Sequence, residues 1–294
     1  MMLVRWADLQ SLVYMVLYPS LMAWQWIYGI QWYLYLLMLV LSVGLSVVQH
    51  NHTHLRMWRL KPLNRLTDAY LSVIQGIPSY VFFPSHIGNH HRFNHGPDDE
   101  TRTYRFGGHH NHLLGYLLHP FQALTVVVPT SLKYLRKRSK KSDYQPLFEV
   151  ILIGTSTIIL ASVNLQLWFI LVFLPQMHGL HWLLGANYLQ HAGARPSSGP
   201  EASQPSTLDY SRNFTGAVNL IWFNIGYHSA HHEFPREHWS DLSALHKTKE
   251  SNIPAWLIER SLMFYMLSWL NLFSRKRPRN FHDLSLVMDD APPR

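Results

Sequence analysis

Histidines are the residues of this chain whose type and spacing could do chemistry. The 294-residue sequence contains 20 histidines and no cysteine. Any bound metal must therefore be held by histidine, aspartate or glutamate. The candidate ligands fall into four groups: His50 and His54; His86, His90 and His91; Asn187 and His191; and His228, His231 and His232. These imidazoles exceed the roughly four to six ligands of one ion, so the sequence predicts two metals, for which imidazole leaves Zn, Cu, Fe and Ni open.

The first group lies in "VVQHNHTHLRMW", where histidines stand at every second position. Helical residues four apart are separated by about 40° and residues two apart by about 200°. His50 and His54 therefore share a face, and both are predicted ligands. His52 points away, so we expect it behind the ligands or on the surface.

Two other segments, "HIGNHH" and "GYHSAHHEFP", each place a histidine three or four residues before an adjacent pair. This spacing predicts three ring nitrogens on one side of a helical turn. In "NYLQHAG", Asn187 comes one turn before His191. The "GGHHNH" histidines lack this spacing and are predicted to be interfacial loop residues; they are His109, His110 and His112.

Metal-binding imidazoles usually need a partner for their second N–H. The acidic residues close enough in sequence to provide one are Asp68, Asp98, Asp99, Glu100, Asp209, Glu233 and Asp241.

Two long segments without Asp, Glu, Lys or Arg must position these histidines: one between Asp8 and Arg56, the other between Glu149 and Arg195. Each has the length of two apolar helices of about 20 residues. We predict two transmembrane hairpins, and hence four spans, in an all-α integral membrane protein. The first has helices at 10–28 and 31–49 with a turn at Gly29, and the second has helices at 147–163 and 165–184 with a turn near Asn164.

Basic residues gather beside these runs and account for much of the net charge of +8. Because basic loops stay in the cytoplasm, we expect both termini and the histidines there. The chain is then one domain, 1–294, with a cytoplasmic helical cap (50–146 and 185–275) and a tail (276–294). Segments 113–132 and 253–273 are predicted to lie at the membrane interface. No nucleic-acid-binding motif accompanies the charge, so we expect no nucleic acid partner.

The combination of histidine boxes and paired hairpins resembles the membrane-bound fatty acid desaturase and hydroxylase superfamily. The matching boxes are His50-x3-His54, His86-x3-His90-His91 and His228-x2-His231-His232, with Asn187-x3-His191 as a fourth element. The resemblance runs from about residue 10 to about residue 246. The box spacings do not assign a subfamily.

This resemblance implies a non-haem di-iron centre in the cytoplasmic cap, with O2 as co-substrate and a lipid or fatty acyl chain as substrate. It also implies that Asn187 reaches a metal through water. No fused haem-binding domain is visible, so electrons are expected from a separate ferredoxin or cytochrome with its reductase.

Three reactions would share such a centre. Desaturation is our first expectation, hydroxylation the second, and oxidative decarboxylation to a terminal alkene the third. They differ in substrate placement by about an ångström, which no motif encodes. A different class, a histidine-rich metal transporter or a zinc-dependent membrane hydrolase, accounts for fewer of the residues. A transporter should carry ionisable residues within its spans, and a hydrolase needs only about three ligands for one zinc.

Overall fold

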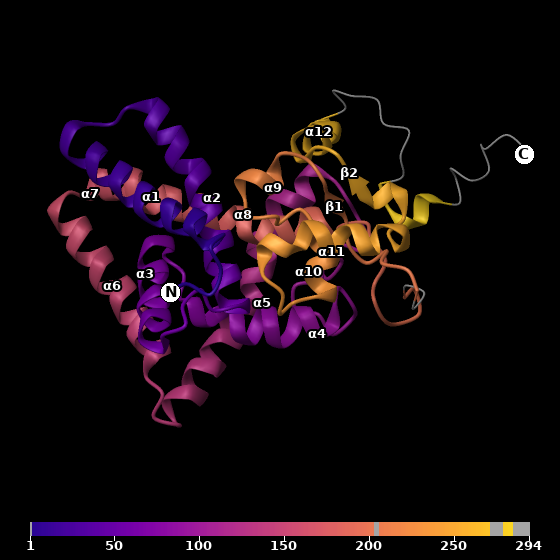
Figure 1. Cartoon of the computed structure of the whole chain (residues 1–294), viewed down its shortest axis with the longest axis horizontal. Coiled ribbons are helices and arrows are strands. Elements are labelled where there is room, and N and C mark those ends of the chain that lie inside the picture. Colours follow the sequence, from indigo (N-terminus) through magenta and orange to yellow (C-terminus); the bar gives the residue numbers. More distant parts are fainter. Residues whose placement is uncertain (1, 203–205, 271–278, 285–294) are drawn as a thin grey trace, which may run out of the picture. The chain divides into compact units, whose positions relative to one another are not determined.

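The structure is a computed structural model that describes residues 2–202, 206–270 and 279–284. It is mostly helical, as predicted, and its two strands in the described residues have 2 residues each (Figure 1). The chain divides into two compact units, one formed by Met1–His86 with Val128–Leu183 and the other by Ile87–Val127 with Leu184–Arg294. Most of the predicted tail 276–294 lies outside the described residues.

The first unit contains the two predicted hairpins. Its elements are α1 (Asp8–Tyr28), α2 (Trp32–His54), α3 (Lys61–Gln75), η1 (Ser79–Val81), α6 (Gln145–Val163), α7 (Leu165–Trp168) and η3 (Phe169–Phe173). Three further helices cross the limits between the units: η2 (Phe83–His90), α5 (Leu113–Ser139) and α8 (Leu174–His191). Helix α1 packs on α2 and α3 packs on α6.

Both hairpin turns occur at the predicted residues, for local reasons. Gly29 ends α1 with φ 91°, a backbone conformation that glycine adopts without steric cost. Asn164 ends α6 in an extended conformation, and its side-chain oxygen accepts a hydrogen bond from the backbone N–H of Leu167 (3.0 Å), which caps α7. Helix α2 continues five residues past its predicted end at 49, so His50 and His54 lie in its last turns.

Four helical stretches are long and apolar enough to cross a membrane: α2, α5, α6 and the run Leu165–His191. Three of them coincide with predicted spans. Helix α1 is not among them, since its tyrosine, tryptophan and glutamine residues lower its hydropathy. Helix α5 is among them, and it runs without interruption through Pro120 and Pro129. That α1 spans the membrane and that residues 113–132 lie at its interface stay predictions of the sequence.

The second unit is built from short elements. They are α4 (His91–Phe93), β1 (Asn213–Phe214), α9 (Val218–Ile221), α10 (His228–Glu233), η4 (Trp239–Asp241), α11 (Leu242–Lys249), η5 (Glu250–Asn252), η6 (Ala255–Leu257), β2 (Ile258–Glu259), α12 (Leu262–Leu267), η7 (Ser268–Leu270) and η8 (Phe281–Asp283). β1 and β2 are parallel, with Asn213 paired to Ile258 and Phe214 to Glu259. A small core packs beside them, formed by Ala194, Leu208, Tyr210, Ile253 and Leu257.

The segment 253–273, expected as an interfacial helix, is not one continuous helix in the structure, while its position at the membrane interface stays a prediction. Up to residue 270, this segment forms η6, β2, α12 and η7 in succession. Glu259 belongs to β2 and is only 4% exposed, so its side chain faces the protein interior instead of water. Ser261 then accepts a hydrogen bond from the N–H of Phe264 and starts a new helix.

Candidate metal centre

Four histidines of the second unit converge with their ring nitrogens: His90, His191, His228 and His232. The facing nitrogens all lie within 4.8 Å of one another. His191 Nε2 is 2.9 Å from His228 Nε2, and His228 Nε2 is 3.0 Å from His232 Nε2. All four side chains are buried, none more than 5% exposed. We call them the four-histidine group.

Three of these rings use their other nitrogen to bond outward. His90 Nδ1 donates to Asp99 Oδ2 (2.7 Å), and His191 Nδ1 donates to the carbonyl oxygen of Tyr210 (2.8 Å). His232 Nδ1 lies 2.7 Å from Asn94 Oδ1. A proton on Nδ1 leaves the Nε2 lone pair of each ring free to point into the group, which is the state that metal coordination requires.

The spacing of the nitrogens also fits a metal. A tetrahedral ion with N ligands at about 2.0–2.1 Å places those nitrogens about 3.3 Å apart. The observed Nε2–Nε2 distances of 2.9 and 3.0 Å need only a few tenths of an ångström of adjustment. A cation between the rings would also remove the repulsion between their facing lone pairs. The residues present therefore fit a bound transition metal.

Asp99 is the hydrogen-bond hub beside this group. Its Oδ2 accepts from His90 Nδ1 and from the backbone N–H of His95 (2.9 Å), while its Oδ1 accepts from the backbone N–H (2.8 Å) and the hydroxyl (2.9 Å) of Thr101. Burial by itself would raise the pKa of Asp99. The His90 ring and the donated hydrogen bonds outweigh burial and lower this pKa below its ordinary value. Asp99 is therefore a carboxylate that orients His90.

The buried rings of His232 and His95 stay neutral. Burial, followed by the repulsion of neighbouring histidines, holds the pKa of His232 well below its ordinary value. Burial likewise lowers the pKa of His95 to about 3. Neutral imidazole is the form that binds metal, so the environment of His232 prepares it as a ligand.

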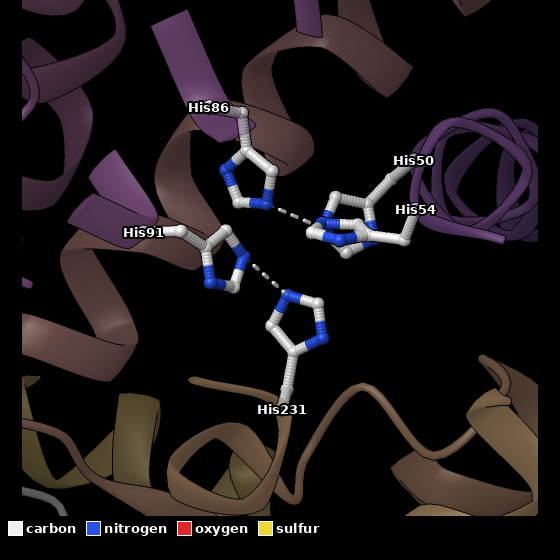
Figure 2. A group of neighbouring side chains, drawn as sticks. All are labelled: His50, His54, His86, His91 and His231. Atoms are coloured by element: carbon white, nitrogen blue, oxygen red, sulfur yellow. Dashed lines mark hydrogen bonds between the residues drawn. The ribbon is translucent and has the colours of Figure 1, made fainter. Parts of the chain in front are cut away.

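A second set of histidines lies in the first unit, on α2 and η2. The ring centroids of His50 and His54 are 4.7 Å apart, and those of His50 and His86 are 4.5 Å apart. His50 Nε2 is 2.7 Å from His86 Nε2, the contact drawn as a dashed line in Figure 2. His50 and His54 share one helix face, which confirms the sequence prediction. His86 belongs to η2, a π-helix, a type of helix frequent at functional sites.

Adjacent histidines of the second unit point in different directions. His91 Nε2 lies 3.0 Å from His231 Nε2 (Figure 2), whereas their sequence neighbours His90 and His232 belong to the four-histidine group. The prediction that each cluster gathers three rings on one side is therefore wrong. Successive helical residues are rotated by about 100°, so a His-His pair divides between two directions, while residues four apart, such as His228 and His232, stay together.

His52 has a structural role. It is 2% exposed, which excludes the predicted surface position. Its Nδ1 accepts the backbone N–H of Met57 (3.2 Å), and its Nε2 lies 3.3 Å from the carbonyl oxygen of Asn64. The ring joins the end of α2 to the start of α3 and points away from His50 and His54.

The sequence predicted only some of the groups that bond the outward nitrogens of the four-histidine group. Of the acidic candidates, Asp99 bonds the predicted ligand His90 directly, whereas Asp68 pairs with Arg56 (2.6 Å) and Asp209 with Arg195 (3.3 Å). Glu233 accepts the hydroxyl of Tyr210 (3.0 Å). Sequence reasoning missed Asn94 and the carbonyl oxygen of Tyr210. The sequence could have indicated Asn94, because it is a polar residue three positions after His91. A backbone carbonyl such as that of Tyr210 cannot be recognised from residue types.

Asn187 lies one turn before His191 on α8, as predicted. Its amide nitrogen donates to the carbonyl oxygen of Thr101 (2.7 Å) and lies 3.2 Å from His119 Nε2. A role for Asn187 at a metal through water stays a prediction.

Long apolar helices, together with a buried group of imidazoles of which three bond outward through Nδ1, define the class of this protein: a membrane protein with histidine clusters that could hold a metal. The family model described as fatty acid desaturase matches residues 14–260, which include all the predicted ligands. The chain belongs to this family, and so to the membrane-bound fatty acid desaturase and hydroxylase superfamily. It is therefore an oxidoreductase of lipid chains, a class that generally works with electron donors. No curated protein matches the chain.

Proposed function

We propose that this protein is an O2-dependent, non-haem di-iron oxidase that removes hydrogens from an unactivated C–H position of a fatty acyl chain, with desaturation as its reaction. The observation that carries the proposal is the four-histidine group, in which three buried rings bond outward through Nδ1 and turn Nε2 toward one point. Family membership supplies the substrate class.

Iron is the metal that we propose. Imidazole ligands accept several transition metals, so the donor set alone leaves the choice open. Breaking an aliphatic C–H bond is beyond the acid–base chemistry of side chains, and bound iron would supply the redox chemistry with O2. The protein's own residues hold the ligands in place, keep His191 and His232 neutral and exclude water from the buried group.

We propose His90, His191, His228 and His232 as the ligands of one iron. For the second iron we propose the remaining histidines of the sequence prediction: His50, His54, His86, His91 and His231. Asn187 is proposed as a ligand through water. The support for the second set is the pairing of ring nitrogens within each unit, His50 with His86 and His91 with His231.

The location of the proposed centre, its substrate and its electron donor are proposed from the apolar helices and the basic patches beside them. Basic patches beside the apolar helices support a cytoplasmic location for both termini and the metal centre. A fatty acyl substrate would then reach the centre from the bilayer. We propose a separate ferredoxin or cytochrome, with its reductase, as the electron donor.

The experiment is a single-turnover assay on purified protein. The protein is reduced without oxygen, then mixed with O2 and a panel of fatty acids, and the products are identified by mass spectrometry. Loss of two hydrogens supports desaturation. Gain of one oxygen would assign hydroxylation, and loss of carbon dioxide would assign decarboxylation; either result would replace desaturation as the reaction.

Metal analysis of the same preparation tests the cofactor. We expect about two irons per chain. His228→Ala should lose iron and activity together, whereas His112→Asn should keep both, because His112 lies outside the proposed ligands and asparagine retains an acceptor for the backbone N–H of Gly115. One zinc and no iron in the active preparation would refute the proposal in favour of a hydrolase.

A further inference from the structure

A third cluster of metal-type ligands lies in the second unit and shares no residue with the proposed di-iron centre. It consists of His109, Glu201 and His282, whose ligand atoms lie within 4.8 Å of one another. His109 Nε2 is 3.1 Å from Glu201 Oε2, and His282 Nε2 is 3.8 Å from Glu201 Oε1. One carboxylate thus faces two imidazole nitrogens. His109 and His282 each lie more than 80 residues from Glu201 in the sequence, one before it and one after it.

The ring of His109 is held by aromatic neighbours. It stacks on Tyr104, with ring centroids 4.5 Å apart and an interplanar angle of 26°. Its edge meets Phe281 at 5.0 Å and 81°. These contacts fix the plane of the ring on the Gly107–Gly108 loop, so that Nε2 points to Glu201. The position of this ligand is therefore set before any ion arrives.

His282 is presented by η8, which is anchored at several points. Asn280 and Asp283 form a reciprocal capping box around this short helix. The backbone N–H of Phe281 donates to the carbonyl oxygen of Gly193 (2.9 Å), and the Phe281 side chain is only 4% exposed. The guanidinium of Arg195 lies over the Phe281 ring at 4.9 Å. Burial of Phe281 leaves the next side chain, His282, at the surface.

Glu201 projects from the loop that follows α8. It lies within a turn in which the N–H of Ala202 donates to the carbonyl oxygen of Gly199 (3.1 Å). The Glu201 side chain is 46% exposed and that of His282 is 50% exposed, while that of His109 is 16% exposed. The cluster is open to solvent on the side of Glu201 and His282, so an ion can enter.

The geometry suits an ion with short bonds. Zn–N bonds of about 2.0–2.1 Å and Zn–O bonds of about 2.0–2.2 Å at tetrahedral angles separate neighbouring donors by about 3.3 Å. The observed 3.1 and 3.8 Å bracket this value. Two exposed side chains can make the remaining shift by small rotations. Without an ion, the same contacts are surface ion pairs, which contribute at most about 1 kcal/mol.

We propose that His109, Glu201 and His282 bind one divalent transition-metal ion of the zinc class, with water completing the coordination. Two imidazoles and one carboxylate are a common ligand set for such ions. Bound metal would tie η8 to the His109 loop and to the segment after α8. The site is independent of the proposed oxidase chemistry, since none of its residues belongs to that centre.

The test counts zinc on purified full-length protein with its resident metal in place. Protein is incubated with excess ZnCl2 and desalted, and zinc and iron are measured in the same sample. We expect wild type to retain one zinc ion more per chain than Glu201→Gln or His282→Ala, with the same iron content in all. The matched control is His112→Asn, a neighbouring exposed histidine outside the cluster, which should retain the wild-type amount of zinc.

Hydrogen exchange on the wild type provides a second measurement that needs no variant to fold. Zinc should slow amide exchange in residues 279–284 and around His109. Equal zinc in wild type and both cluster variants, zinc lost equally in His112→Asn, or unchanged exchange in 279–284 would each overturn the proposal. Iron content and lipid oxidation report separately on the other centre, so failure of one proposal is distinguishable from failure of the other.

Discussion

Asp99→Asn is the most informative single change in the four-histidine group. Both carboxylate oxygens of Asp99 accept hydrogen bonds: Oδ2 from His90 and the backbone of His95, and Oδ1 from the backbone and hydroxyl of Thr101. Asparagine replaces one of these oxygens by an NH2 group. Whichever way the amide is turned, the NH2 meets a backbone N–H that cannot rotate away.

The cost follows from the groups that lose their partner. A buried donor left unsatisfied costs about 1–3 kcal/mol, and a hydrogen bond to a charged group contributes about 1.5–3 kcal/mol. We expect the free energy of unfolding to fall by about 2–4 kcal/mol. If the NH2 faces His90, that ring must accept at Nδ1 and carry its proton on Nε2, which blocks coordination. Loss of such a partner weakens metal binding by about 10–100-fold.

The assay measures iron bound per chain over a range of buffered free Fe(II), together with thermal unfolding of the metal-free protein. Asp98→Asn is the matched control, since this neighbouring side chain is exposed. Wild-type iron affinity in Asp99→Asn, or an equal loss in Asp98→Asn, would refute the role assigned to Asp99.

His54→Ala should reduce bound iron, whereas His52→Ala should leave the iron content intact. His52→Ala should instead lower the free energy of unfolding by about 1–3 kcal/mol, because the N–H of Met57 loses its acceptor. Equal iron loss in both variants would contradict this assignment. The pKa of His95 is about 3 against an ordinary 6.5, so below pH 6.5 the unfolded chain binds a proton that the folded chain refuses. Above pH 6.5, His95 therefore does not lower the free energy of unfolding of the metal-free protein. As the pH drops from 6.5 toward 3, His95 should lower this free energy by about 1.4 kcal/mol per pH unit. His95→Gln should flatten the pH dependence of the melting temperature, and an unchanged slope would refute the explanation. Gly226→Ala should lower the free energy of unfolding by about 1–3 kcal/mol and lower metal content, because a Cβ there overlaps the carbonyl oxygen of Phe214. In Gly154→Ala the Cβ meets no atom within 4 Å, so thermal stability and metal content should be unchanged or improved. Similar melting temperatures for the two variants would count against this packing.

Local sequence signals predicted the helices that carry the site. Charge-free runs, a glycine at one turn and an asparagine at the other located both hairpins of the first unit. The spacing of four residues placed His50 with His54, and the same spacing holds His228 with His232. Both successes concern residues within one α-helix, whose regular geometry sets the angle between two side chains by their separation along the chain.

The sequence failed where a residue's role depends on a distant segment. The interfacial helix expected at 253–273 gave way to β2, because its partner strand lies about 45 residues earlier, at Asn213 and Phe214. The "GGHHNH" segment showed no ligand spacing, because the two side chains that could bind a metal together with His109 are Glu201 and His282, which lie far away in the sequence.

Residue type and helical spacing thus determined, before any fold was known, that the chain is helical, rich in apolar spans and equipped with more imidazoles than one metal can use. Tertiary structure decided which imidazoles of the second unit meet one another. It gathered His90, His191, His228 and His232 into one group and paired His91 with His231, and it brought Asp99, Asn94 and the Tyr210 carbonyl behind three of the predicted ligand rings. The physical reason is that a proton on Nδ1 is fixed by whichever acceptor the packing brings to it, and such an acceptor leaves no trace in the spacing of the histidines.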